Sequence, residues 1–192
     1  MISDELKCIY IHIPKTGGMS IETMLGMDVK KVHQQAMKIK HGTPKEWKYP
    51  DYWETYYKFT FVRNPWDRVV SSYFFNLKMA NKNIKQHDRG KINNYGEEGF
   101  NDYVINNLKH SKSRHFLPYT HWISGYTYDF IGKLENFEND MKSVCENIKI
   151  KFKNVHINKS NRKKYQEYYN KESRDVIEEI YREDIARFDY SF

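Results

Sequence analysis

The chain has 192 residues and a formal net charge of +7, from 32 lysines and arginines against 25 acidic residues. This length favours a single domain over residues 1–192, and a chain of this size can keep a core without disulfides or a metal. It contains no apolar run of about 18 residues, so no membrane span is predicted. The start, Met1–Glu5, is acidic where a secretion signal is basic. We therefore expect a cytoplasmic protein, with Cys8 and Cys145 as buried free thiols.

The first predicted element is a strand over Cys8–Ile13, which is nearly continuous in β-branched and apolar residues. Such a run is typical of a strand buried on both faces in a parallel sheet. A turn cluster, Pro14–Gly18, follows the strand. A short helical pattern follows this turn and ends near Gly26.

The next segment of the chain, residues 58–77, repeats this order of strand, turn and helix with a clearer sequence pattern. Lys58–Val62 predicts a strand, Asn64 is placed to cap a helix, and Pro65 stands at the first helical position. The apolar residues that follow recur with a helical period and predict an amphipathic helix: Trp66, Val69, Val70, Tyr73, Phe74 and Leu77.

Further along, residues 81–98 are polar and predict a mobile loop, while Phe100–Leu108 predicts a helix. Tyr128–Gly132 predicts a third strand, followed by a helix that Asn136 would cap. The remaining predictions are a fourth strand at Val155–Ile157, a basic loop over Asn158–Lys164, and a last helix capped by Ser173. Strands that alternate with helices indicate right-handed crossovers and a parallel α/β sheet.

Two of the predicted loops carry groups suited to anions. Ligands of open parallel sheets bind beyond the carboxyl ends of the strands, so Pro14–Ser20 and Arg63–Asp67 should face one crevice. The first loop combines Lys15 with glycines and hydroxyls at a helix start. Lys15 precedes the glycines, unlike the lysine of the nucleotide-hydrolase phosphate loop. Arg63 adds a planar cationic fork, and Ser71 adds a hydroxyl two helical turns on, which suits a second phosphate.

These segments resemble a known family. Ile11–Ser20 resembles the 5′-phosphosulfate loop of sulfotransferases that use 3′-phosphoadenosine 5′-phosphosulfate (PAPS), and Phe61–Tyr73 looks like their 3′-phosphate-binding segment. Asp129–Phe137 and the tail from Tyr181 are similar to segments of the carbohydrate branch, the Golgi-type sulfotransferase family 2. The resemblance implies a three-layer α/β sandwich with a central parallel sheet, the P-loop nucleotide-kinase-like sulfotransferase fold.

By this resemblance, the chain transfers the sulfuryl group from PAPS to a carbohydrate or similar hydroxyl and leaves adenosine 3′,5′-bisphosphate. Lys15 would neutralise charge on the bridging oxygen, and Arg63 and Ser71 would hold the 3′-phosphate. The basic loop would close over the nucleotide, with Arg162 in contact with the 3′-phosphate or the adenine. No metal is implied. The 5′-phosphate would be held by a run of loop residues: Lys15, Thr16, Gly17, Gly18, Met19 and Ser20.

The general base is the least defined group. His33 is favoured and His41 is the alternative, since carbohydrate sulfotransferases commonly carry the base between the two nucleotide loops. A surface histidine without a catalytic role is the competing interpretation for each. His12, inside the first strand, is interpreted as a packed or loop-orienting residue.

Two other classes of function fit parts of the sequence. A nucleotide or small-molecule kinase of related fold is the main alternative, although the displaced Lys15 disfavours it. A nucleic-acid-binding module would use the basic clusters, such as Lys149–Lys164, which holds seven basic residues and no acid. We expect a glycan-like hydroxyl acceptor, no nucleic-acid partner and no membrane span.

Overall fold

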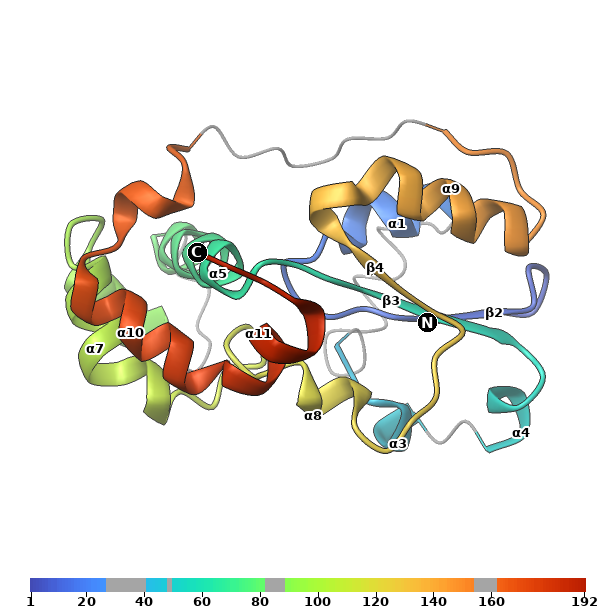
Figure 1. The fold of residues 1–192 in the computed structure, drawn as a ribbon, viewed down its shortest axis with the longest axis horizontal. Helices are drawn as coiled ribbons and strands as arrows, with labels where there is room; N and C mark the ends of the chain where they lie inside the picture. The colour runs from blue at the N-terminus through green and yellow to red at the C-terminus, as the bar shows by residue number, and fades with distance from the viewer. Residues whose placement is uncertain (27–40, 48–49, 82–88, 154–161) are drawn as a thin grey trace. The chain divides into compact units, whose positions relative to one another are not determined.

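The computed structural model describes residues 1–26, 41–47, 50–81, 89–153 and 162–192 (Figure 1). The chain folds into two compact units. The first unit comprises Met1–Arg63 and Tyr119–Ser160, and the second comprises Asn64–Pro118 and Asn161–Phe192. Each unit has a hydrophobic core of its own. The single domain expected over residues 1–192 stays a prediction.

The first unit is built on a four-stranded sheet with the strand order β1-β2-β3-β4. β2 pairs with β3 in parallel, and β3 pairs with β4 in parallel, which confirms the predicted α/β class. The edge strand β1 runs antiparallel to β2, and no sequence pattern pointed to a strand of two residues. The strands span Ile2–Ser3 (β1), Cys8–Ile11 (β2), Tyr57–Val62 (β3) and Phe130–Lys133 (β4).

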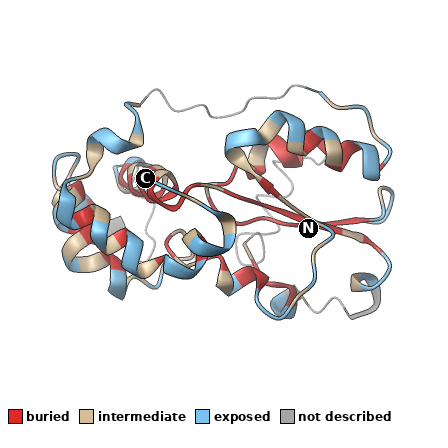
Figure 2. Cartoon of the chain, viewed as in Figure 1, coloured by how far each residue is buried: buried red, intermediate tan, exposed pale blue. Residues whose placement is uncertain are grey.

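Helices lie on both sides of this sheet. Figure 1 shows α1 and α9 on one side of the strands and the short helices α3 and α8 on the other. The two central strands, β2 and β3, are almost entirely buried, whereas β1 and most of β4 are half-buried and the outer side of α9 is exposed (Figure 2). The helices of this unit span Gly18–Met24 (α1), Pro44–Trp47 (α3), Pro50–Trp53 (α4), Thr120–Ile123 (α8) and Phe137–Asn147 (α9), with a 3₁₀ turn at Leu134–Asn136.

The core between the sheet and helices α1 and α9 contains both cysteines. Cys8 and Cys145 are free and buried, as predicted. Burial raises the pKa of the Cys8 thiol to about 11, so this thiol stays protonated at neutral pH. The Sγ atom of Cys145 lies 3.7 Å from the Sδ atom of Met24. Both cysteines therefore pack as small apolar side chains.

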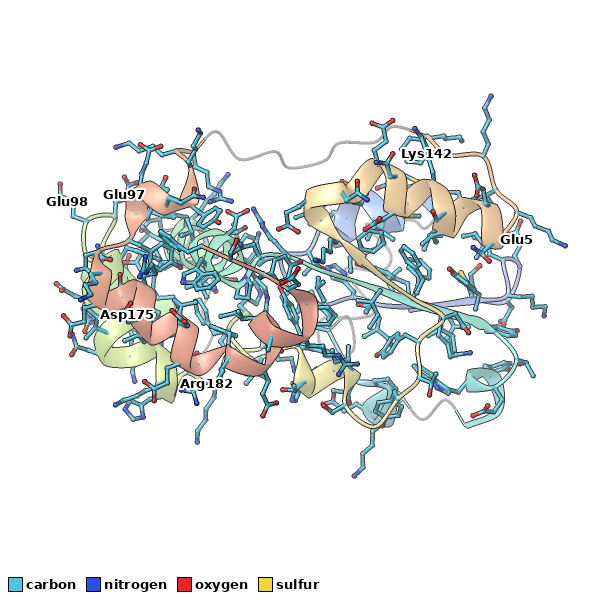
Figure 3. All side chains as sticks on the ribbon, viewed as in Figure 1. Glu5, Glu97, Glu98, Lys142, Asp175 and Arg182 are labelled. Atoms are coloured by element: carbon cyan, nitrogen blue, oxygen red, sulfur yellow. The ribbon has the colours of Figure 1, made fainter. Side chains whose placement is uncertain are left out.

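The second unit is helical within the described residues. Its core is formed around the apolar face of α5, and the predicted residues Trp66, Val69 and Tyr73 are all buried there. Among its exposed charged side chains, Glu97, Glu98, Asp175 and Arg182 project away from the ribbon (Figure 3). Its helices span Pro65–Ala80 (α5), Arg89–Tyr95 (α6), Phe100–Asn107 (α7), Lys171–Ile180 (α10) and Arg182–Phe188 (α11), with 3₁₀ turns at Leu108–His110 and Tyr165–Tyr168.

Two predictions of the sequence were wrong in part. The loop over 81–98 contains helix α6, because Ile92, which is buried, and Tyr95, which packs against the same core, anchor a segment that is otherwise polar. Ser173 does not precede the last long helix but lies in its first turn. Asn170 is the cap instead: its Oδ1 accepts a hydrogen bond from the Ser173 N–H at 2.8 Å, and the Ser173 hydroxyl returns to the Asn170 N–H.

The predicted cap of α5 is confirmed. The Oδ1 atom of Asn64 accepts hydrogen bonds from the N–H groups of Trp66 (3.1 Å) and Asp67 (3.4 Å). Its Nδ2 atom also donates to the Ser191 carbonyl at 2.7 Å and to the Tyr165 hydroxyl at 3.2 Å. One buried amide therefore starts α5 and holds two later segments of the same unit.

We expect Asn64→Ala to lower the free energy of unfolding by about 2 kcal/mol, because it removes the helix cap and the two donated hydrogen bonds. Asn64→Ser should lose roughly half as much, since serine keeps the cap and loses the donated bonds. Urea unfolding followed by circular dichroism measures both. Equal stability of Asn64→Ala and the native chain would contradict this role.

Candidate functional site

The loop between β2 and α1 has an unusual backbone. Lys15 has φ +68° and Gly17 has φ +87°, so two residues of one short turn occupy the left-handed region. The Thr16 hydroxyl closes this turn by donating to the Ile13 carbonyl at 2.9 Å. A hydroxyl carries one proton, so Thr16 has only its backbone N–H to offer an anion in this geometry. A Cβ on Gly17 would lie 2.8 Å from the Leu134 side chain, so only glycine fits both the space and the φ.

A buried contact between a histidine and a carboxylate lies under this loop. His12, at the end of the first predicted strand, contacts the carboxylate of Glu22 in α1 through its Nδ1 atom, and the two side chains are only 5% and 0% exposed. The His12 Nε2 atom lies 2.0 Å from where a Cβ on Gly18 would stand, so the ring packs directly against the first residue of α1. His12 is thus packed and oriented against the loop, as predicted. Its partner Glu22 was not foreseen, because an acid beside Ile21 on a buried helix face breaks the apolar pattern.

The loop after β3 contacts the loop after β2. Arg63 follows the last residue of β3, and its Nη1 atom donates a hydrogen bond to the Lys15 carbonyl at 3.2 Å. Both residues belong to the first unit. The parallel pairing of β2 with β3 brings the two strand ends to the same edge, as the sequence predicted. A lysine-bearing turn and an arginine therefore lie side by side, which favours the binding of an anion.

Tyr119 is a residue of this edge that the sequence analysis missed. Its hydroxyl accepts a hydrogen bond from the Arg63 N–H at 3.0 Å and donates one to the Arg63 carbonyl. Nothing local in the sequence links residues that lie so far apart, and Tyr119 is one tyrosine among 16. Only the folded chain identifies it.

Ser71 and Arg162 both belong to the second unit. Ser71 lies four residues after Asp67 in α5, so the two side chains share one face of that helix. Arg162 forms an ion pair with Asp67. The guanidinium of Arg162 therefore reaches the face of α5 that also carries Ser71.

The remaining predicted residues of the first loop lie at the start of α1. Met19 is half-buried, and its carbonyl accepts a hydrogen bond from the Thr23 hydroxyl at 2.9 Å. Ser20 is buried, at 7% exposure. Together with Gly18 they form the first turn of the helix, and the Ser20 N–H donates a hydrogen bond to the Gly17 carbonyl at 3.0 Å.

Of the two candidate bases, the structure describes His41. His33 lies outside the described residues. His41 packs edge-on against His12, with ring centroids 4.6 Å apart, and its Nδ1 atom lies 3.0 Å from the His12 carbonyl oxygen. The carbonyl of His41 in turn accepts a hydrogen bond from Trp122 Nε1. His41 is thus held next to the strand that leads into the Lys15 loop.

The described ranges contain neither a metal cluster nor a membrane helix. Within them, no group of three or more His, Cys, Asp or Glu side chains is arranged to hold a metal ion. None of the helices in those ranges has the length and apolar character needed to cross a bilayer.

Comparison with known proteins bears on the whole chain. Residues 1–191 match the family model described as "Sulfotransferase family". No curated protein and no solved structure matches the chain at a significant level. The match includes the Lys15 loop, the Arg63 segment and the sheet that carries them. This chain therefore belongs to the sulfotransferase family, and it is an enzyme of the PAPS-dependent sulfotransferase class.

Proposed function

We propose that this enzyme transfers the sulfuryl group of PAPS to a hydroxyl of a carbohydrate or similar acceptor and releases adenosine 3′,5′-bisphosphate. The observation that carries the proposal is the hydrogen bond from the Arg63 guanidinium to the Lys15 carbonyl. A donor with phosphate groups at both ends of its ribose needs two cationic sites at a fixed separation. This contact supports the proposal, because it joins the arginine proposed for the 3′-phosphate to the loop proposed for the phosphosulfate, in a chain that belongs to the family.

In this proposal the Lys15 loop holds the phosphosulfate end of the donor. The N–H groups of Thr16 through Ser20 bind the 5′-phosphate, and Lys15 neutralises the charge that develops on the bridging oxygen. The left-handed backbone at Lys15 and Gly17 supports this role, because such turns direct successive N–H groups toward one point.

The 3′-phosphate would be held by Arg63, Ser71 and Arg162. A guanidinium has five N–H donors, so Arg162 can bind a phosphate oxygen while it remains paired with Asp67. The shared helix face of Asp67 and Ser71 supports a joint role for the Ser71 hydroxyl and Arg162. Because ATP lacks a 3′-phosphate, these residues would select PAPS against ATP.

At the acceptor, the attacking hydroxyl oxygen forms a bond to sulfur as the bond from sulfur to the bridging phosphate oxygen breaks. The hydroxyl proton passes to a general base, for which we propose His33 before His41. The exposed lysines Lys149, Lys151 and Lys153 support an anionic glycan as acceptor.

Adenosine 3′,5′-bisphosphate should raise the thermal unfolding temperature of the protein, whereas ATP with Mg²⁺ should raise it far less. The difference arises from the 3′-phosphate, which only the first ligand carries. Thermal shift measurements at matched ligand concentrations test this. Equal stabilisation by the two nucleotides would remove the support for a 3′-phosphate site and favour the kinase alternative.

Lys15→Ala should lower kcat by about 100-fold or more, since it removes a cation that acts mainly on charge developing in the transition state. The affinity for adenosine 3′,5′-bisphosphate should fall by less than about 10-fold, because the loop amides and Arg63 remain. Turnover with labelled PAPS and calorimetry measure the two effects. Lys45→Ala, at an exposed lysine, is the matched control. A variant with normal kcat would exclude Lys15 from the chemical step.

Arg162→Ala should weaken binding of adenosine 3′,5′-bisphosphate by about 10-fold, the usual worth of one charge-assisted hydrogen bond. Binding of adenosine 5′-phosphate, which lacks the 3′-phosphate, should change little. Lys163→Ala is the control, because it removes the same charge from the exposed neighbouring position. Calorimetric titration of all three proteins separates the cases, and equal losses for both variants would indicate a general charge effect.

A further inference from the structure

The hydroxyl of Tyr119 forms hydrogen bonds with both backbone groups of Arg63. It accepts from the Arg63 N–H at 3.0 Å and donates to the Arg63 carbonyl. Its side chain is fully buried, at 0% exposure. Both residues belong to the first unit, although 56 positions separate them in the chain. The proposed function gives Tyr119 no role so far.

Arg63 stands where the sheet stops. The last pair of the ladder between β3 and β4 is Val62 with Lys133, so Arg63 lies one residue beyond it. Backbone N–H and C=O groups at such a position need partners if they are buried. The Tyr119 hydroxyl serves both groups, and it therefore fixes the peptide planes on either side of the Arg63 Cα atom at the point where the chain leaves the sheet for α5.

The orientation of the Arg63 side chain depends on that backbone. Its Nη1 atom donates to the Lys15 carbonyl at 3.2 Å. The Lys15 loop therefore holds the guanidinium end of the side chain, and Tyr119 holds the backbone from which the side chain starts. A guanidinium binds phosphate best through two parallel hydrogen bonds, which require a defined plane. A shift of the backbone by a fraction of an ångström would spoil this geometry without removing any charge.

We propose that Tyr119 is a positioning residue for recognition of the 3′-phosphate: its hydroxyl holds the backbone of Arg63 so that the guanidinium presents the correct plane to the nucleotide. This inference rests on the proposed function, in which Arg63 binds the 3′-phosphate. It goes beyond that function in assigning nucleotide selectivity to a hydroxyl that does not itself touch the nucleotide.

Tyr119→Phe tests the proposal, because it removes one hydroxyl and keeps the buried ring. The matched control is Tyr181→Phe, since Tyr181 is 1% exposed and its hydroxyl donates to a backbone carbonyl, that of Phe116. Calorimetry gives the affinity of each protein for adenosine 3′,5′-bisphosphate and for adenosine 5′-phosphate. The ratio of the two affinities measures recognition of the 3′-phosphate, and a merely structural loss leaves this ratio unchanged.

In Tyr119→Phe, we expect adenosine 3′,5′-bisphosphate to bind about 10-fold more weakly and adenosine 5′-phosphate to bind within about twofold of the native value. Tyr181→Phe should keep the native ratio of the two affinities, even if it lowers the thermal unfolding temperature by as much as Tyr119→Phe does. The inference would be overturned if Tyr119→Phe kept the native ratio of the two affinities. It would also be overturned if Tyr181→Phe changed this ratio as much as Tyr119→Phe does.

A double-mutant cycle with Arg63→Ala gives a second, independent test. In an Arg63→Ala background, adding Tyr119→Phe should change the affinity ratio no further, because Tyr119 acts through Arg63. Additive effects would overturn the proposal. Failure of the proposed function has a different signature: the native protein itself would then bind both nucleotides equally, whereas failure of this inference alone leaves the native preference intact and Tyr119→Phe unchanged.

Discussion

The parallel pairing of β2 with β3 is the constraint on which the candidate site depends. In this register Ile11 stands opposite Thr60, and the Thr60 hydroxyl adds a hydrogen bond to the Ile11 carbonyl at 2.7 Å. The two strands therefore end at the same edge, where the Lys15 turn leaves one of them and Arg63 the other. A slip of one strand by one residue would move its side chains to the opposite face of the sheet, so the hydrophobic core fixes the register and with it the position of the two cations.

The elements that the sequence predicted well are those with a local cause. β2 and β3 follow from runs of β-branched and aromatic residues, and α5 follows from an apolar period with Asn64 and Pro65 at its start. Each of these signals lies within the segment that it describes. The same holds for the Lys15 turn, whose glycines mark a backbone that other residues do not adopt readily.

The elements that were missed depend on contacts between distant residues. Helix α6 is polar apart from Ile92 and Tyr95, so its helical form comes from the packing of these two side chains in the second unit and not from its own pattern. Glu22 and Tyr119 gain their places only when His12 and Arg63 are brought beside them. A single sequence carries no mark of such pairs, because each member on its own is compatible with many environments. The candidate site was therefore predicted in its cations and loops, but not in the residues that hold them.

The buried pair of His12 and Glu22 shows how such a supporting residue can suit a site for anions. A carboxylate at 0% exposure under the Lys15 loop would repel a phosphate if its charge were uncompensated. Burial strongly disfavours an unpaired charge, and the contact with the His12 Nδ1 atom gives this carboxylate a polar neighbour. The contact also ties the end of the strand to helix α1 on either side of the Lys15 turn. Removing His12 alone would undo both effects together, since it would free the loop and leave the carboxylate buried without its neighbour.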